Sequence, residues 1–554
     1  MMKKITCLLL LLVMTMPLFS CGKRLTVDET KTQLYVYVYD GGVGTDWLQS
    51  IKAKFEAKYA DRPFQPGTSK KGVEIVIAPG KDALTSLESS PYNVIFTEQV
   101  FYNDLISQKQ LLDITDIVAE KTLEEVSDGL ETGTIEDKLA AEQKDAITAL
   151  DGKYYVIPHY ESYSGITYDV KVFEDNELFF REGGGWTNIK TEMTVGPDGI
   201  RTTYDDGLPS SYEEFSQLLT RMYLMGVIPF IWSGQYATYT NNLVTGAWAA
   251  YAGKEEFMLS FNFGTGNGKD IATEVVTGFD AENKPVTTNM TITPNTGYFT
   301  LQQAGRYYGL ELLSTILSDA RWYSDKIDTN LSHLDAQREY IYSDLEENPI
   351  GMIIEGSYWY NEAKNAFRQS ENTYKEKAKN RRFAWMPLPR QVSGSVTEGN
   401  GTRNTVLDTL SSFGFINANI QDRDYLVDLA KLFLQYCYTD EAMIDFTLNT
   451  GLPKALQYTI PSKTVATMNH YYQSINQIRL NSDIIYPYSS QEIFINNQSS
   501  FSLAGTSNFW ASTVSGTPYA FPFTAFKAGK SAQDYFKGMW KDPVTWETMY
   551  GQYF

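Results

Sequence analysis

Cysteine and histidine are scarce in this chain of 554 residues, with three of each. The histidines, His159, His333 and His470, stand apart from one another, so no His/Cys cluster has the spacing of a zinc site. The sequence also lacks the HExxH pair of metalloproteases and the G-x-S-x-G turn of common hydrolases. These absences argue against zinc-dependent and serine-hydrolase chemistry, and we expect no cofactor.

Positive charge is in deficit as well. The chain has 47 Lys and Arg against 67 Asp and Glu, which gives a formal net charge of −20. A strongly acidic surface repels the phosphate backbone, so we expect no nucleic-acid partner. Hydrophobic residues, at 43%, are still sufficient for large cores. A chain of this length therefore predicts a globular protein of two or three domains.

Long apolar runs are absent except at the N-terminus. There an apolar stretch follows Lys3 and Lys4 and is shorter than the ~20 residues that span a bilayer, which is typical of a secretory signal peptide. We interpret residues 1–20 as that signal. The sequence LFSCG at its end resembles a bacterial lipobox, which predicts cleavage before Cys21 and attachment of lipid to this cysteine.

The lipobox also bears on the few cysteines. Cys7 would leave with the signal peptide and Cys21 would carry lipid, so Cys437 would stand alone and no internal disulfide could form. Residues 21–32 would be the lipidated tether. The mature protein is therefore expected at the extracytoplasmic face of the bacterial cell membrane, held there by its N-terminal lipid.

Strand-like and helix-like segments alternate from residue 33 onward. TQLYVYVYD has the alternation of a strand, and WLQSIKAKFEAKYA repeats a large apolar residue every four positions, as a helix does. GVEIVIAPG and YNVIFTE supply further strands with room for a helix between them, which predicts an α/β layout with a mainly parallel sheet. Such sheets bind ligands in the loops at the carboxyl ends of their strands, which here hold Asp40 and Glu98.

Several strand ends carry an aromatic and a polar residue together, as in VYDGG, FTEQ, PHYESYSG, FIWSGQY and IEGSYWY. The C–H face of a sugar ring stacks on Trp or Tyr, and its hydroxyl groups bind carboxylates and amides. The set of turns predicts a carbohydrate ligand, although any one of these rings is more often packed in a core. The many acidic residues also leave open a carboxylate pair for glycoside hydrolysis.

Taken in order, several segments resemble the family 1 extracellular solute-binding proteins, the maltose-binding-protein-like receptors of ABC importers. DGKYYVIPHYESYSGITYDVKVFED is similar to the family's Gly-Lys-Tyr strand, its Pro and its Tyr-Asn/Asp pair before a helix. LPSSYEEFSQLLTRM resembles its Pro-x-Ser/Thr-x-x-Glu helix start, and NPIGMIIEGSYWYNEA its Gly-x-Trp segment. With FAWMPLPR and the late helices ending in GLP, the resemblance covers about residues 33–460.

The resemblance implies an α/β fold of two lobes, joined by hinge strands, with a ligand cleft between the lobes. Lobe 1 would comprise residues 33–158 and 416–455. Lobe 2 would comprise residues 159–415 and 456–554, so the chain would cross near Pro158, near Phe415 and near Gly451. The segments 182–207 and 252–300 exceed typical members of the family and are expected to be insertions, the first of them a hairpin.

The resemblance also implies a set of ligand-binding residues from both lobes and the hinge: Asp40, Glu98, Glu161, Trp232, Tyr236, Tyr358, Trp359, Tyr360 and Trp510. Among the consecutive rings of Tyr358, Trp359 and Tyr360, one is expected to face the ligand while its neighbours pack beneath it. Successive residues at a helix start point about 100° apart, and the sequence alone does not say which ring faces outward.

The resemblance implies a receptor without enzymatic activity. We expect a monomer that captures a sugar or oligosaccharide and delivers it to the permease subunits of an ABC transporter. Two alternatives stay open: a surface glycan-binding or adhesion protein, and a glycoside hydrolase. The hydrolase would need two carboxylates about 5–9.5 Å apart in the cleft.

Overall fold

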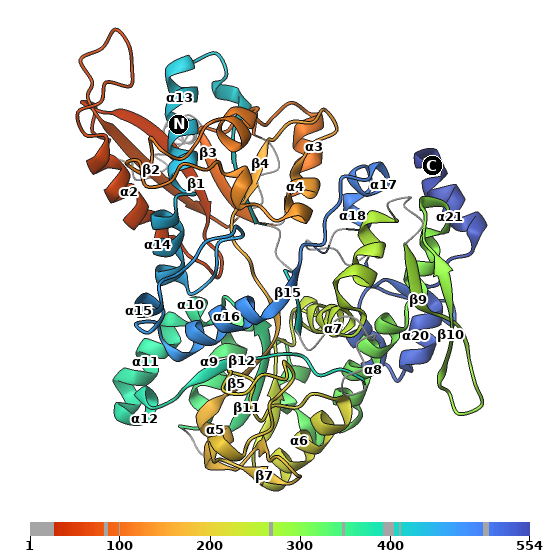
Figure 1. Cartoon of the computed structure of the whole chain (residues 1–554). Helices are drawn as coiled ribbons and strands as arrows, with labels where there is room; N and C mark the ends of the chain where they lie inside the picture. Colours follow the sequence, from red (N-terminus) through yellow and green to blue (C-terminus); the bar gives the residue numbers. More distant parts are fainter. Residues whose placement is uncertain are drawn as a thin grey trace, which may run out of the picture.

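The computed structural model describes residues 27–81, 87–98, 100–264, 270–345, 349–391, 404–408, 412–501, 503 and 509–554. These residues form two α/β lobes and a third unit beside them (Figure 1). The predicted signal peptide and Cys21 lie outside the described residues. Among the described helices, none combines the length and the apolar composition needed to cross a membrane.

Lobe 1 is built on a five-stranded sheet in the order β2-β1-β3-β14-β4. β1 (Thr32–Tyr39) runs parallel to β2 (Val73–Gly80) and β3 (Val94–Glu98), in agreement with the alternation of strands and helices in the sequence. β14 (Ser412–Ile416) is antiparallel to both β3 and β4 (Val156–Pro158). The helices of this lobe are α2 (Asp46–Lys58), α3 (Tyr102–Ser107), α4 (Ala141–Ile147), α13 (Asp424–Tyr436) and α14 (Asp440–Thr450).

Lobe 2 has a four-stranded sheet in the order β12-β5-β11-β8. β11 (Ile350–Gly356) pairs parallel with β8 (Ile228–Ile231) and antiparallel with β5 (Ser164–Asp169), which in turn pairs antiparallel with β12 (Phe383–Met386). The helices of this lobe are α5 (Val170–Asp175), α6 (Tyr212–Leu224), α9 (His333–Ser343), α10 (Trp359–Glu362), α11 (Lys364–Tyr374), α12 (Glu376–Lys379) and α16 (His470–Asn481).

Three segments connect the lobes. The first joins β4 to β5, the second joins β13 (Asn404–Leu407) to β14, and the third lies between α14 and α16. The expected boundary at residues 415–416 is wrong, because the whole of β14 belongs to the sheet of lobe 1, beginning at Ser412. The reason is local: all five residues of this strand, SFGFI, are buried and pair with β3, and Phe413, Gly414 and Phe415 also pair with β4.

The two expected insertions differ in kind. At the start of the first, β7 (Trp186–Thr187) pairs antiparallel with β6 (Phe179–Phe180), which precedes residue 182, in a short hairpin. In the second, α7 (Thr238–Asn262) continues well past residue 252, with a kink at Gly253, where φ is 73°. The hairpin of β9 (Ile271–Phe279) and β10 (Pro285–Thr291) projects from the body (Figure 1), whereas the described residues before it continue the packed helix α7.

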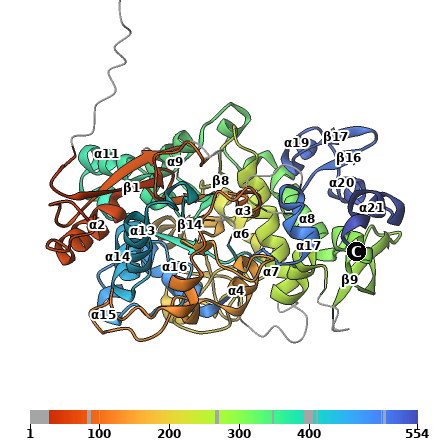
Figure 2. The same cartoon turned by 90° about the horizontal axis from the view of Figure 1, so that it is seen from above.

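The third unit combines this middle region with the C-terminal residues, and Figure 2 shows it beside the two lobes. It contains the second half of α7, β9, β10, α8 (Ala304–Ser318), α17 (Glu492–Ile495), α18 (Gln498–Phe501), β16 (Ser512–Val514), β17 (Thr517–Tyr519), α19 (Pro522–Lys527), α20 (Ala532–Met539) and α21 (Pro543–Tyr550).

Aromatic rings connect the third unit to lobe 1. The ring of Tyr488 lies 5.9 Å from that of Phe413 on β14 and 5.9 Å from that of Phe494 on α17. Phe494 in turn lies 6.3 Å from Phe261 on α7. The ring of Phe523 on α19 lies 6.3 Å from that of Trp232 in lobe 2. The C-terminal segment therefore packs on both lobes, whereas residues 456–554 were expected to belong to lobe 2 alone.

Candidate functional site between the lobes

The carboxyl ends of parallel strands from both lobes meet at the interface between the lobes. In lobe 1 these are the ends of β1 and β3, and in lobe 2 the ends of β8 and β11. The chain enters lobe 2 through β5, and β11 runs antiparallel to it, so β11 ends at the side of lobe 1. Loops at such strand ends are where open α/β sheets bind ligands.

Tyr358 is the ring that faces the other lobe. Its side chain is half-buried and packs against the core of lobe 1, although the residue follows β11 of lobe 2. A methyl group added to Gly42 of lobe 1 or to Gly356 of lobe 2 would overlap this ring. The ring therefore lies between two glycine backbones, one from each lobe, and glycine is needed at both positions for this close approach.

Hydrogen bonds and an ion pair hold the loop after β1 against lobe 2. Asn361 Nδ2 donates to the carbonyl oxygens of Gly42, at 3.0 Å, and Val43, at 2.6 Å. Lys364 Nζ lies 2.6 Å from Asp46 Oδ2. Asn361 was not among the sequence-based candidates, although helical spacing indicates it, because it follows Tyr358 by three residues and so lies on the same face.

Glu98 presents a carboxylate from the end of β3. Tyr160, in the first connecting segment, donates its hydroxyl hydrogen to Glu98 Oε1. Burial raises the pKa of Glu98 to about 7, the charge of Glu362 acts in the same direction, and the hydrogen bond from Tyr160 opposes them. Glu98 is therefore close enough to lobe 2 to sense its charges, as a ligand group from lobe 1 should be.

Lobe 2 contributes two more acids beside Tyr358. Gln337 Nε2 donates to Glu355 Oε1 at 3.0 Å and to Glu362 Oε2 at 2.6 Å, and so links the two carboxyl groups. His333 Nε2 lies 3.7 Å from Glu362 Oε1. Burial raises the pKa of Glu355 well above its ordinary value, and the charge of Glu362 adds to the rise. None of these four residues was a sequence-based candidate, because their partners are distant in sequence.

Two further candidates lie at the edge of this interface. Tyr236 follows β8, is 43% exposed, and has its ring 5.6 Å from that of His333. Asp40 is half-buried at the start of the loop that contacts Tyr358, and its backbone N–H donates to the Gly80 carbonyl at 2.7 Å. The structure thus brings Asp40, Glu98, Tyr236 and Tyr358 to the facing ends of the sheets.

Glu161 has a different place. Its carboxylate has no exposed surface and accepts from Arg479 Nε at 2.8 Å and Nη2 at 3.1 Å, and from the hydroxyl groups of Tyr163 and Tyr486. Arg479 also donates to the carbonyl oxygens of Lys454 and Leu456 in the third connecting segment. With its acceptor positions occupied, Glu161 holds the connecting segments together and offers nothing to a ligand.

The tryptophan candidates are core residues. Trp359 and Trp232 have no exposed surface, and Trp359 is surrounded by rings from four elements of lobe 2. Trp510 is 2% exposed and donates from Nε1 to Thr245 Oγ1 on α7 at 2.7 Å. Tyr360 stacks on Tyr471 with centroids 5.4 Å apart. These four residues are therefore corrections to the expected site: large apolar rings gain most by full burial.

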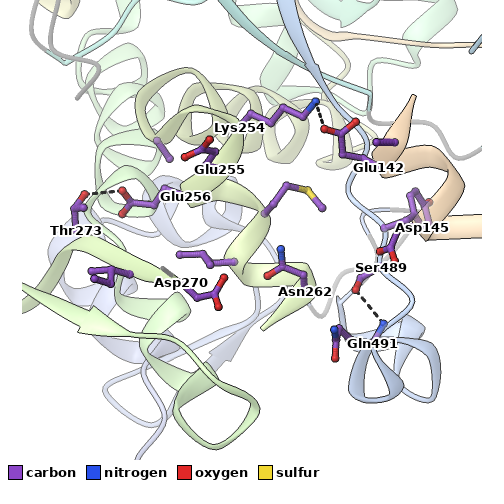
Figure 3. A pocket seen from close by; sticks show the side chains of 16 residues that line it. Glu142, Asp145, Lys254, Glu255, Glu256, Asn262, Asp270, Thr273, Ser489 and Gln491 are labelled. Atoms are coloured by element: carbon purple, nitrogen blue, oxygen red, sulfur yellow. Dashed lines mark hydrogen bonds and ion pairs between the residues drawn. The ribbon is translucent and has the colours of Figure 1, made fainter. Parts of the chain in front are cut away.

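A separate pocket of about 740 Å³ lies between α4 of lobe 1 and α7 and β9 of the third unit (Figure 3). Lys254 Nζ lies 2.8 Å from Glu142 Oε1 across it, and Ser490 Oγ donates to Asp145 Oδ1 at 2.7 Å. No sequence-based candidate lines this pocket. Its walls belong to lobe 1 and the third unit, so it is distinct from the strand-end site.

Sequence comparison finds no matching family model and no matching curated protein. Solved structures do match, and the three described next each have a TM-score of 0.52. A chitin oligosaccharide binding protein is 13% identical over 94% of this chain and 99% of its own. The apo-form of RafE from Streptococcus pneumoniae is 11% identical over 95% of this chain and 99% of its own. Maltose-bound MalE3 of T. maritima is 12% identical over 94% of this chain and 100% of its own.

The chain has the fold of the two-lobe periplasmic binding proteins. This confirms the α/β two-lobe architecture expected from the sequence. At 11–13% identity the likeness concerns the fold, and the residues that would contact a ligand follow from the geometry of this chain alone.

The raised pKa of Glu98 predicts a specific pH dependence of stability. Its carboxyl group has an ordinary pKa of 4.5 and a pKa of about 7 in the folded protein, so its stabilising contribution is complete below about pH 4.5. That contribution is lost as the pH rises through about 7. We expect Glu98→Gln, which does not titrate, to lessen the fall in unfolding free energy between pH 4.5 and 8 by about 2–3 kcal/mol.

Urea denaturation at several pH values measures this difference. The exposed Glu124 provides the control, because Glu124→Gln removes the same charge without a buried environment. Equal pH slopes in the wild type and in Glu98→Gln would contradict the assignment.

Proposed function

We propose that the protein is a carbohydrate-binding receptor without catalytic activity. The observation that carries this proposal is the position of Tyr358, a ring held between the backbones of both lobes, with Glu98 of lobe 1 close enough that, besides burial, its charge raises the pKa of the Tyr358 hydroxyl group. An aromatic face and nearby hydrogen-bond acceptors are the groups that a sugar ring needs. Structures of similar fold carry the names of a chitin oligosaccharide binding protein and of maltose-bound MalE3.

The composition of the site favours a neutral sugar over an anionic solute. The acids Glu98, Glu355 and Glu362 lie near the contact between the lobes, and Lys364, a cation at this contact, is paired with Asp46. An anionic ligand would meet these carboxylates without a compensating charge. A sugar or oligosaccharide instead offers hydroxyl groups that donate to them.

The wider setting belongs to the same proposal. A lipid on Cys21 would hold the receptor at the extracytoplasmic face of the membrane, where the two lobes could close on a ligand and present it to ABC permease subunits. The receptor would act as a monomer. A glycan-binding surface protein without a permease would use the same site. Reconstitution with candidate permease subunits separates the transport receptor, which would support sugar uptake, from the surface protein, which would not.

Ligand screening tests the proposal directly. We expect one or more sugars or oligosaccharides to raise the midpoint of thermal unfolding, because a ligand that binds only the folded state stabilises it by mass action. The midpoint should rise further with ligand concentration, and the recovered sugar should be unchanged. Stabilisation by another solute class alone would overturn the carbohydrate assignment, and appearance of cleaved glycan would favour the hydrolase.

A further inference from the structure

A second, smaller pocket lies at the end of lobe 1 that is opposite to the ligand site. It has a volume of about 390 Å³ and lies at the amino ends of two strands, where Thr32 begins β1 and Asn93 precedes β3. The loops before α13 close its other side through Asn419 and Arg423. Since the proposed sugar site is at the carboxyl ends of the same strands, the two sites are separated by the length of the sheet.

The charge of this pocket is unlike that of the chain as a whole. The residues that line it include two cations, Lys70 and Arg423, and no Asp or Glu. Among the residues that the structure describes, neither cation pairs with a carboxylate. Lys70 Nζ instead donates to Gln33 Oε1 at 3.4 Å. In a protein with a net charge of −20, a pocket that is lined by Lys70 and the exposed Arg423 and by no acidic residue favours an anion.

A buried hydroxyl group supplies an independent sign of a ligand. Thr32 lines the pocket and is 2% exposed, and its Oγ1 is buried without a hydrogen-bond partner. An unsatisfied buried hydroxyl is costly, so such groups usually have a partner that is not part of the chain. A bound oxyanion would accept a hydrogen bond from this hydroxyl and from the two cationic side chains.

We propose that this pocket binds a phosphate-type oxyanion, supplied by the headgroup of an anionic lipid. The choice of lipid rests on the proposed anchor at Cys21. The eleven residues from Cys21 to Thr32 span at most about 40 Å, which keeps the pocket within reach of the headgroups. Free phosphate presents the same chemistry, and the experiment below separates the two sources. The pocket would then hold the amino-terminal end of lobe 1 at the membrane surface.

The test uses the mature chain, residues 21–554, with Cys21→Ser so that no lipid is attached and every described residue is kept. Calorimetric titration with inorganic phosphate, at constant ionic strength, measures the oxyanion. We expect binding that the double variant Lys70→Gln/Arg423→Gln weakens at least roughly tenfold, because two charge-assisted hydrogen bonds are lost. The matched control, Arg338→Gln/Lys379→Gln, removes the same charge from exposed positions on lobe 2 and should leave binding unchanged.

The hydroxyl group has its own variant. Thr32→Val keeps the shape of the side chain and removes the unpaired group, so the thermal midpoint without phosphate should be unchanged or higher. Affinity for phosphate should fall severalfold. Absence of phosphate binding by the wild type, or equal weakening by both double variants, would overturn the proposal.

Vesicle flotation identifies the source of the oxyanion. The Cys21→Ser chain should float with vesicles of phosphatidylcholine and phosphatidylglycerol, and not with phosphatidylcholine alone, and Lys70→Gln/Arg423→Gln should abolish flotation. Phosphate binding without flotation would overturn the lipid source and assign the pocket to the free ion. A sugar that stabilises the wild type should stabilise the Lys70→Gln/Arg423→Gln variant equally, so failure of this pocket is distinguishable from failure of the proposed sugar function.

Discussion

Tyr358→Ala is expected to weaken sugar binding by about 2–4 kcal/mol, or roughly 30- to 1,000-fold, while the unfolding free energy falls by only about 1–2 kcal/mol. The ring is half-buried, lies against the backbone at Gly42 and Gly356, and packs on the core of lobe 1, so its loss leaves the buried core of lobe 2 in place. The loss instead removes the stacking face and the contact between the lobes. Isothermal titration measures the affinity, and urea denaturation measures the stability.

The neighbouring ring provides the matched comparison. Trp359 has no exposed surface and packs on Tyr340, Phe367 and Phe383, so Trp359→Ala should cost about 3–5 kcal/mol of stability through loss of burial and creation of a cavity. In the fraction that stays folded, affinity for the sugar should be close to that of the wild type. If Tyr358→Ala instead lost stability and kept its affinity, Tyr358 would be a core residue and the proposed site would be wrong.

A third variant separates stacking from closure. A methyl group on Gly42 would overlap the Tyr358 ring, so Gly42→Ala should hold the lobes apart while leaving the ring itself in place. We expect weaker binding and an increased radius of gyration in the presence of ligand. A wild-type radius in this variant would show that the loop after β1 yields, and that closure does not depend on this contact.

The fold could be predicted because its evidence is local. The alternation in TQLYVYVYD and the spacing of Trp47, Ile51 and Phe55 each describe one element, and both elements formed where expected. The same reasoning failed at residues 252–262, where a polar, glycine-containing sequence continues as helix α7. Tertiary packing determined the helical structure of this segment, because Phe257, Phe261 and Phe263 are buried among aromatic rings of the third unit.

The site was harder to predict because burial and pairing are non-local. The sequence placed aromatic and acidic residues at strand ends correctly, and it could not show which of them are already occupied. Glu161 and Arg479 lie 318 residues apart, and nothing near either residue indicates the pair. Likewise Trp232 and Trp510 are residues of a type that sugar sites use, but both side chains are buried in a core. Within IEGSYWY, the ring that faces the other lobe is that of Tyr358, which lies between the backbones of Gly42 and Gly356.

The pairing of Glu161 with Arg479 predicts the largest loss of stability at the hinge. Arg479→Met should destabilise the protein by about 3–5 kcal/mol, because it leaves a fully buried carboxylate without its cation. It also removes the donors to the carbonyl oxygens of Lys454 and Leu456, which tie the third connecting segment to the first. The exposed pair of Arg338 and Asp335 is the control, since Arg338→Met should cost less than about 1 kcal/mol.

A double-mutant cycle distinguishes loss of the pair from loss of packing at the hinge. Glu161→Gln/Arg479→Met removes both charges, so it should be less destabilised than the sum of the two single variants, with a coupling of about 1–3 kcal/mol. Purely additive losses would mean that Arg479 acts through its aliphatic stem. Because Glu161 offers no exposed oxygen, the Glu161→Gln variant that remains folded should bind sugar with wild-type contacts at Tyr358 and Glu98. Its affinity should then change only as far as the hinge shifts the balance between open and closed lobes.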